Sequence, residues 1–220
     1  GKCTFQQPNP KLLSFLPPSI TSIDPLGGTT KGGVATTIRG ANFGPSSVVV
    51  TLLSGTMPWT SVVHVDDATI TAVSPVLSGV NNGKGLVVKV TIGGQEGTST
   101  YNYAAPTLIS VDPLAQTKTG GNDGILMTLH GTDFANVDLN RITIVAKGGT
   151  VDIPCSSVTR VDYETLTCMY PDGGAGGCTD RNIYVTVAEQ ETTETIPLCY
   201  RQAAGAGPLT GVPVSDAISA

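Results

Sequence analysis

Apolar and polar residues alternate in short runs along most of the chain, and clusters of Gly, Pro, Asn or Asp separate the runs. Alternation with a period of two is typical of a strand that packs one face on a core, and turn-forming residues end such strands. The pattern therefore predicts antiparallel strands joined by tight turns. The clearest runs are residues 35–38, 47–53, 69–73, 86–92, 125–130, 141–146, 165–169 and 183–187.

These runs belong to two copies of one repeat. The matching segments keep their order along the chain, and their spacing grows from 88 to 97 residues, which indicates loop insertions in the second copy. About seven strands in roughly 90 residues is typical of an immunoglobulin-like sandwich. The matches are residues 20–26 with 108–114, 40–43 with 131–134, 58–62 with 154–158, 69–71 with 165–167, 88–90 with 185–187, and Tyr103 with Tyr200.

The repeat predicts an all-β protein made of two tandem immunoglobulin-like antiparallel β-sandwich domains. We expect an N-terminal strap at residues 1–17, a first domain at 18–104, a second domain at 105–201 and a C-terminal tail at 202–220. Very little sequence is left between the two domains to act as a linker.

The repeated residues resemble the IPT/TIG domain family. Its members open with a Pro-x-Ile-x-x-Ile-x-Pro strand, continue through a Gly-Gly loop into a Thr-x-Ile-x-Gly-x-x-Phe-Gly strand, and close on a Tyr. The resemblance covers about residues 18–200, with one departure, because Ala135 stands where the family has Gly. The matching residues are Pro18, Ile20, Ile23, Pro25, Gly32, Gly33, Thr37, Ile38, Gly40, Asn42, Phe43, Gly44 and Tyr103, then Pro106, Pro113, Gly120, Gly121, Thr128, Leu129, Gly131, Phe134 and Tyr200.

The motif residues are those that a β-sandwich needs for its structure. Proline bends or ends an edge strand, glycine suits a turn or a bulge, and a large aromatic residue fills a core. We therefore assign structural roles to Pro25, Pro113, Gly40, Gly131, Phe43 and Phe134.

Composition narrows the choice of partners. Charged residues are 13% of the chain, the formal net charge is −5, and the 12 Lys and Arg are scattered. Nucleic-acid binding needs clustered basic residues, so no nucleic-acid partner is expected. No apolar stretch has transmembrane length, so these 220 residues are not expected to insert in a membrane. The start at Gly1, without Met or a signal core, favours a mature product of the secretory route.

The cysteines predict disulfides in the second copy. Repeat alignment places Cys155 on Trp59 and Cys168 on Ala72, and a large residue opposite a small one fills the space of a disulfide. Four cysteines permit three pairings, and this argument selects Cys155 with Cys168, leaving Cys178 with Cys199. Such bonds imply an oxidising, extracellular or cell-surface location.

Cys3 is then left over as a candidate intermolecular thiol, whose partner lies in another chain or in sequence absent from these 220 residues. A zinc site is the rival reading of the cysteines. The spacing contains no Cys-x-x-Cys, so we expect disulfides and not zinc.

The sequence shows no catalytic motif. His64 and His130 stand alone, and no phosphate loop, nucleophile elbow or metalloprotease helix is present. Asp66–Asp67 and residues 122–124 were the candidates for calcium, but two adjacent Asp cannot surround an ion, and Asn-Asp-Gly suits a tight turn. We therefore expect no enzyme, no cofactor and no metal.

Function is expected at the tails. The strap contains apolar residues at 12, 13, 15 and 16, and the C-terminal tail alternates apolar and polar residues at 209–214. A homopolymer packs such tails onto the next copy, so the first hypothesis is a subunit of an extracellular fibre or surface assembly. The resemblance supports two alternatives: a spacer or ligand-binding ectodomain of a cell-surface adhesion receptor, with other cell-surface proteins as partners, and an accessory module of a secreted polysaccharide-acting enzyme.

Overall fold

The computed structural model describes residues 15–44, 47–52, 57–79, 81–113, 115–117, 124–148, 151–170 and 181–201. The chain divides into two compact units. Unit 1 holds Gly1–Gly28, Gly32–Pro75 and Gly85–Asn102, and unit 2 holds Thr29–Lys31, Val76–Lys84 and Tyr103–Ala220. Two loops of the first repeat, residues 29–31 and 76–84, thus belong to unit 2, although the junction near residue 103 lies close to the predicted domain boundary.

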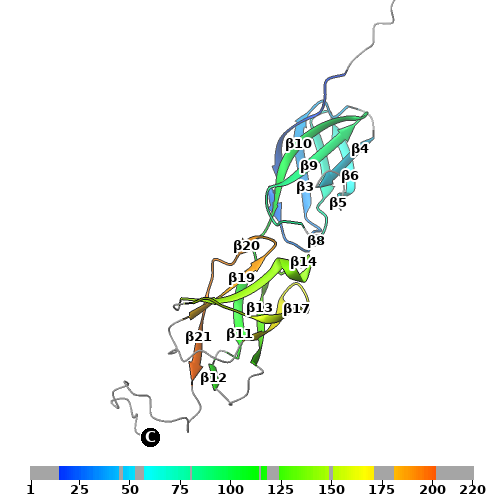
Figure 1. The fold of residues 1–220 in the computed structure, drawn as a ribbon. Coiled ribbons are helices and arrows are strands. Elements are labelled where there is room, and N and C mark those ends of the chain that lie inside the picture. The colour runs from blue at the N-terminus through cyan, green and yellow to red at the C-terminus, as the bar shows by residue number, and fades with distance from the viewer. Residues whose placement is uncertain are drawn as a thin grey trace, which may run out of the picture. The chain divides into compact units, whose positions relative to one another are not determined.

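Unit 1 is built on two sheets (Figure 1). The first sheet has the order β1-β3-β7-β6, with bounds Ser19–Asp24, Ala35–Ala41, Thr69–Val73 and Thr60–Asp66. The second has the order β2-β10-β9-β4-β5, with bounds Gly27–Gly28, Gln95–Tyr103, Leu86–Ile92, Val48–Leu52 and Met57–Pro58.

The sheets of unit 2 repeat this order. One sheet runs β11-β13-β18-β17, with bounds Thr107–Asp112, Ile125–Thr132, Thr165–Tyr170 and Ser156–Arg160. The other runs β12-β21-β19-β15-β16, with bounds Ala115–Thr117, Ile196–Arg201, Arg181–Val187, Ile142–Lys147 and Ile153–Pro154, and β20 (Gln190–Glu191) pairs with β19. A short parallel pair joins β8 (Ser78–Gly79) to β14 (Asn136–Val137), and Leu139–Arg141 form a 3-10 turn.

The all-β class and the immunoglobulin-like sandwich are confirmed, and each of the eight predicted runs falls on a strand of the described residues. The structural roles of the motif residues also hold. Phe43 and Phe134 are fully buried. β1 and β11 end directly before Pro25 and Pro113, each preceded by a cis peptide bond.

The structural glycines lie opposite bulges. Gly40 pairs with Ile20, next to a register shift in β1, and Gly131 pairs with Leu108 next to the same shift in β11. A Cβ at Gly40 would collide with the backbone oxygen of Ser19 and with the ring of Phe43. Both copies therefore need a residue without a side chain at this position.

One sequence match is wrong by two residues. Residues 88–90 do not correspond to 185–187, because Val48 pairs with Ile92 in unit 1 whereas Ile142 pairs with Val187 in unit 2. Ile92 therefore corresponds to Val187, at a spacing of 95. A shift of two keeps every side chain on its own face, so alternation alone does not reveal it.

Candidate functional site

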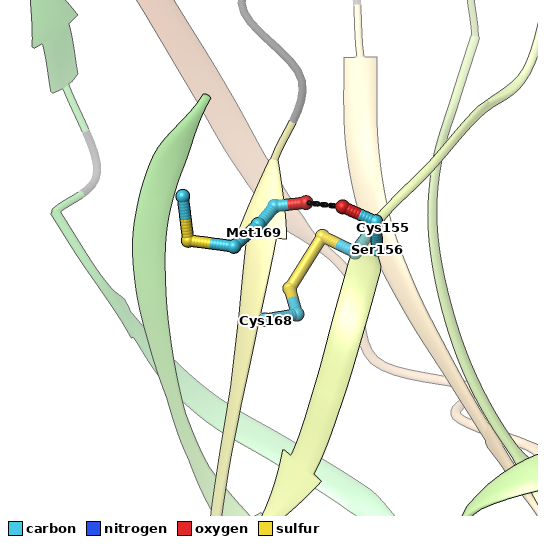
Figure 2. The surroundings of a disulfide bond; sticks show 4 residues. All are labelled: Cys155, Ser156, Cys168 and Met169. Atoms are coloured by element: carbon cyan, nitrogen blue, oxygen red, sulfur yellow. Dashed lines mark hydrogen bonds between the residues drawn. A yellow bond between two sulfur atoms is a disulfide. The ribbon is translucent and has the colours of Figure 1, made fainter. Parts of the chain in front are cut away.

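The predicted disulfide between Cys155 and Cys168 is present in unit 2 (Figure 2). It joins the residue before β17 to the buried face of β18, over a Cα–Cα distance of 5.8 Å. Beside it, the hydroxyl of Ser156 donates to the carbonyl oxygen of Met169 at 3.3 Å. The bond ties an edge strand to its inner neighbour.

The first repeat fills the same place with an aromatic residue. Trp59 N–H donates to Val50 O at 3.0 Å, as Cys155 N–H donates to Ile144 O at 2.8 Å, so the two positions are equivalent. Trp59 is 4% exposed and lies edge-to-face with Tyr101, with ring centroids 5.2 Å apart. Trp59 in unit 1 thus occupies the position of Cys155 and packs on an aromatic ring, whereas unit 2 has a covalent bond there.

The remaining cysteine predictions fall outside the described side chains. Cys3 and Cys178 lie outside the described residues, and of Cys199 only the backbone, in β21, is described. The pairing of Cys178 with Cys199 and the intermolecular role of Cys3 therefore stay predictions.

The acidic residues considered for calcium bind the backbone instead. Asp66 Oδ1 accepts from Ala68 N–H at 2.8 Å, and Asp67 Oδ1 accepts from Gly44 N–H at 2.9 Å. The hydrogen bond from Ala68 is the main cause that lowers the pKa of Asp66. Residues 122 and 123 lie outside the described part of the chain. Among the described residues no three His, Cys, Asp or Glu side chains gather as metal ligands.

The two histidines lie in different units of the chain. His64 lies in β6 of unit 1 and is half-buried, whereas His130 is exposed in β13 of unit 2. Neither has a candidate nucleophile or carboxylate hydrogen-bonded to it among the described contacts.

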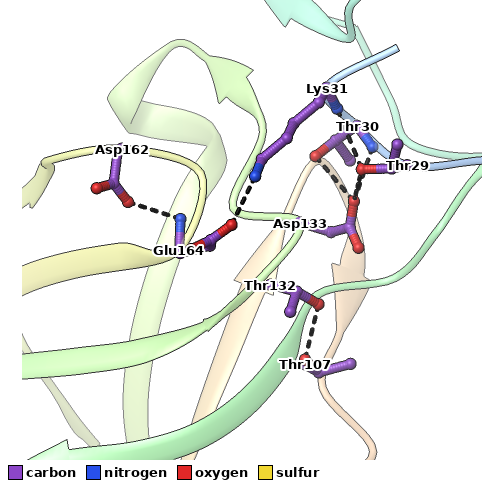
Figure 3. Close-up of polar contacts among 8 residues, drawn as sticks. All are labelled: Thr29, Thr30, Lys31, Thr107, Thr132, Asp133, Asp162 and Glu164. Carbon is purple, nitrogen blue, oxygen red and sulfur yellow. Dashed lines mark hydrogen bonds and ion pairs between the residues drawn. The ribbon is translucent and has the colours of Figure 1, made fainter. Parts of the chain in front are cut away.

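The main polar feature of unit 2 is at the turns that close one end of its sandwich. We call residues 133–135, 163–164 and 188–190 the turn cluster of unit 2. Asp133 Oδ1 accepts hydrogen bonds from Thr29 Oγ1 at 2.7 Å, Thr30 N at 2.7 Å and Thr30 Oγ1 at 3.1 Å (Figure 3). Lys31 Nζ pairs with Glu164 Oε1 at 2.6 Å. Segment 29–31 thus covers this cluster.

Segment 76–84 covers the rest of the same cluster. Gly83 N–H donates to Ala188 O at 2.8 Å, and Gly83 O accepts from Tyr103 N–H at 2.6 Å. Arg141 binds Asn82 through its guanidinium and reaches Glu189 at 3.1 Å. The side chain of Tyr103 is 2% exposed in this arrangement.

Unit 1 has an equivalent turn cluster, residues 42–44, 67–68 and 93–95. The end of the strap lies across it: Gln95 Nε2 donates to Phe15 O at 2.8 Å and Asn42 Nδ2 donates to Pro17 O at 3.1 Å. These bonds hold the strap backbone but leave the side chains of Phe15 and Leu16 80% and 73% exposed.

A pocket of about 510 Å³ opens between the strap and this turn cluster, and its lining is mostly apolar. Phe15, Leu16 and Ile92 supply apolar side chains, and Asp67 and Gln95 supply polar ones. Adjacent apolar side chains that are held in place beside an apolar pocket yet left in solvent indicate a candidate interaction surface. We therefore take the strap and the turn cluster of unit 1 as the candidate functional site.

Sequence reasoning placed function at the tails but did not find this surface. The signal was available, because the spacing of 88 that relates Pro25 to Pro113 also places Phe15 on Tyr103. No helix among the described residues is long and apolar enough to span a membrane.

Solved structures with a similar fold come from several kinds of protein. The extracellular region of plexin A4 is 18% identical, with a TM-score of 0.37, and the match covers 91% of this chain and 20% of that one. SGBP-B from a xyloglucan utilization locus of Bacteroides uniformis is 17% identical, with a TM-score of 0.32, covering 83% and 49%. The titin tandem A164-A165 is 8% identical, with a TM-score of 0.33, covering 80% and 92%.

The sequence comparison is more specific. Residues 18–105 match the family described as IPT/TIG domain, and this range contains the Pro, Gly-Gly, Gly-x-x-Phe and closing Tyr positions of the first repeat. The four-stranded sheet of the second repeat, β11-β13-β18-β17, has the same strand order as the four-stranded sheet of the first, β1-β3-β7-β6. The first repeat of this chain is therefore an IPT/TIG domain.

Proposed function

We propose that the chain is a non-catalytic extracellular structural protein, a segment of a fibre or surface assembly that joins its neighbour through the end of unit 1. The observation that carries the proposal is the strap: two hydrogen bonds hold its backbone while Phe15 and Leu16 face solvent beside a mostly apolar pocket. Holding apolar side chains in place before binding lowers the entropy cost of docking.

The non-catalytic part of the proposal agrees with the family, whose domains are generally immunoglobulin-like modules without catalysis. Of the described carboxylates, Asp66 and Asp67 accept from backbone N–H groups, and Glu164 pairs with Lys31. The extracellular part is supported by the Cys155–Cys168 disulfide, since such bonds persist in oxidising compartments. Non-reducing peptide mapping of native material checks this bond and the Cys178–Cys199 pair together.

Electron microscopy of native material tests the assembly. Filaments or ordered layers whose spacing is near the length of one protein subunit support the proposal. Dispersed single particles at all concentrations contradict it, and they favour the alternative of a spacer or ligand-binding ectodomain of a cell-surface receptor.

A glycan-binding accessory role is less well supported. Sugar platforms use exposed aromatic rings, and the single Trp of the chain, Trp59, is 4% exposed. Among the described residues the large exposed aromatic side chain is Phe15, which belongs to the strap.

A further inference from the structure

The turn clusters of the two units correspond residue by residue. Asn42 stands where Asp133 stands: both have a positive φ, 61° and 59°, and both precede a fully buried Phe. Gln95 stands where Gln190 stands, because each pairs with the last residue of the preceding strand across a two-residue turn. Both clusters therefore have a Gln at one of these places and an Asn or Asp at the other.

The chain that enters each unit also corresponds. Phe15 precedes Tyr103 by 88 positions, the spacing that separates Pro18 from Pro106. Gln95 Nε2 donates to Phe15 O at 2.8 Å, and Gln190 Nε2 donates to Tyr103 O at 3.3 Å. The strap therefore has the backbone contacts of the segment that leads from the first repeat into the second.

One difference separates the two clusters. Tyr103 is 2% exposed, because its unit includes the first-repeat segments 29–31 and 76–84. Phe15 is 80% exposed, and no comparable segments cover the turn cluster of unit 1 among the described residues. Unit 1 thus has the turn cluster and the entering strap, but among the described residues it has no segments like 29–31 and 76–84 that cover them in unit 2.

We propose that Phe15, Leu16 and the turn cluster of unit 1 form the docking surface for a further repeat of the IPT/TIG type, which precedes the strap in the same polypeptide. In this arrangement Phe15 is the closing aromatic residue of that repeat. The sequence of the strap fits this role, because Leu13-Ser14-Phe15 shows the apolar-polar-aromatic order of Tyr101-Asn102-Tyr103 and Leu198-Cys199-Tyr200.

The polar groups of the surface fit the same partner. The loops that cover unit 2 present a Thr N–H, Thr hydroxyls and a Lys to an acceptor oxygen and to a carboxylate. Asn42 carries an amide oxygen at the place of the Asp133 acceptor, and the cluster carries the carboxylate of Asp67. A repeat with a loop like 29–31 matches the acceptor at Asn42, whereas Ala68 stands at the place of Glu164, so the pair with Lys31 has no direct counterpart.

A three-repeat chain tests the proposal. In this chain a second copy of residues 15–102 replaces residues 1–14. The original Phe15 then follows the Asn102 of the added copy, as Tyr103 follows Asn102 in the parent chain. Hydrogen exchange is measured at the amides of residues 42–44 and 93–95. Burial of one large apolar side chain predicts exchange about 10- to 100-fold slower than in the parent chain.

Phe15→Asp supplies the matched control. In the parent chain the side chain is exposed, so the substitution leaves exchange and stability unchanged. In the three-repeat chain it removes the added protection, whereas Phe15→Tyr keeps it. Protection that survives Phe15→Asp, or no added protection at all, overturns the proposal.

A second copy of this chain is the competing occupant. Its sequence Thr117-Lys118-Thr119 aligns with Thr29-Thr30-Lys31, so it would protect the same amides in the parent chain as concentration rises, and Lys118→Glu would abolish that protection. This result also overturns the proposal. The inference rests on the surface named in the proposed function. If microscopy finds no assemblies, the exchange experiment still tests whether a preceding repeat docks. If no repeat docks, microscopy still tests whether the protein assembles.

Discussion

At the scale of single residues, the tightest constraint is the glycine opposite each bulge. A Cβ at Gly40 or Gly131 would overlap the backbone oxygen of Ser19 or Thr107, which cannot move without breaking the strand pairing. The ring of Phe43 or Phe134 closes the other side of the same space. The Gly of the Gly-x-x-Phe pattern is therefore required because the backbone of the neighbouring strand and the Phe ring leave no space for a side chain.

We expect Gly40→Ala to destabilise unit 1 by about 1–3 kcal/mol, the cost of forcing extra atoms into a packed core. Trp59 is the one Trp of the chain and lies in unit 1, so denaturant unfolding followed by its fluorescence reads this loss. Gly131→Ala is the matched variant and should lower the transition seen by circular dichroism while sparing that of Trp59. Gly94→Asn, with open space around its Cβ position, should cost less, because it adds only the strain of a side chain at a φ of 82°. Equal effects of all three variants would contradict the argument.

Stability should fall in acid through two equivalent aspartates. Hydrogen bonds from the N–H groups of Ala68 and Glu164 lower the pKa of Asp66 and of Asp162 below the ordinary 3.8. Because the folded pKa is lower than the unfolded one, this contribution is complete above the ordinary pKa and is lost as pH falls through the folded pKa. Asp66→Asn and Asp162→Asn keep an acceptor oxygen but do not titrate. The double variant should therefore show a flatter loss of unfolding free energy below pH 4 than the parent chain; an unchanged slope would exclude these two groups.

Residue roles that depend on packing were predictable from the sequence. The exchange of Trp59 and Ala72 for a cysteine pair identified one disulfide, because a sandwich core conserves volume at equivalent positions. The hydrogen bonds of Gln95 and Asn42 to the strap were not predictable, since a polar side chain in a turn gives no pattern that tells which backbone it binds.

At the scale of elements, the disulfide joins the two positions that Trp59 and Ala72 occupy in unit 1, where Trp59 packs on Tyr101 of β10 instead. The Cys155→Ala/Cys168→Ala double variant should lose about 2–4 kcal/mol of unfolding free energy in unit 2, because the bond closes a loop with a sequence separation of 13. Circular dichroism should report the loss while the Trp59 transition in unit 1 stays in place. Cys3→Ser is the control for removal of a thiol as such. A loss shared equally by both units would show that the bond has no local role.

Strand positions were predicted well where alternation was long, as in β9 and β13, and poorly where pairing is short. The pair β8–β14 has two residues in each strand, too few for a period to show. The two-residue error in matching β9 to β19 has the same origin, because equal faces look alike after a shift of two.

At the scale of the whole molecule, unit 2 is assembled from segments distant in the sequence. Asp133→Gly removes the acceptor for Thr29 and Thr30 while suiting the positive φ of 59°. We expect unit 2 to lose about 1–3 kcal/mol, the usual cost of removing hydrogen bonds to a charged group, and Asp133→Asn to retain part of it. Thermal unfolding of the full chain measures both. Equal stability of the Gly variant and the parent chain would show that segment 29–31 does not help to hold unit 2.

The placing of segments 29–31 and 76–84 in unit 2 has a consequence for synthesis on the ribosome. Both segments are made before any strand of the second repeat, and each is a short loop between strands of the first. Domains generally fold as units, in the order of their synthesis. The turns at Asp133 and Ala188 therefore emerge from the ribosome when the groups that bind them, in segments 29–31 and 76–84, are already made.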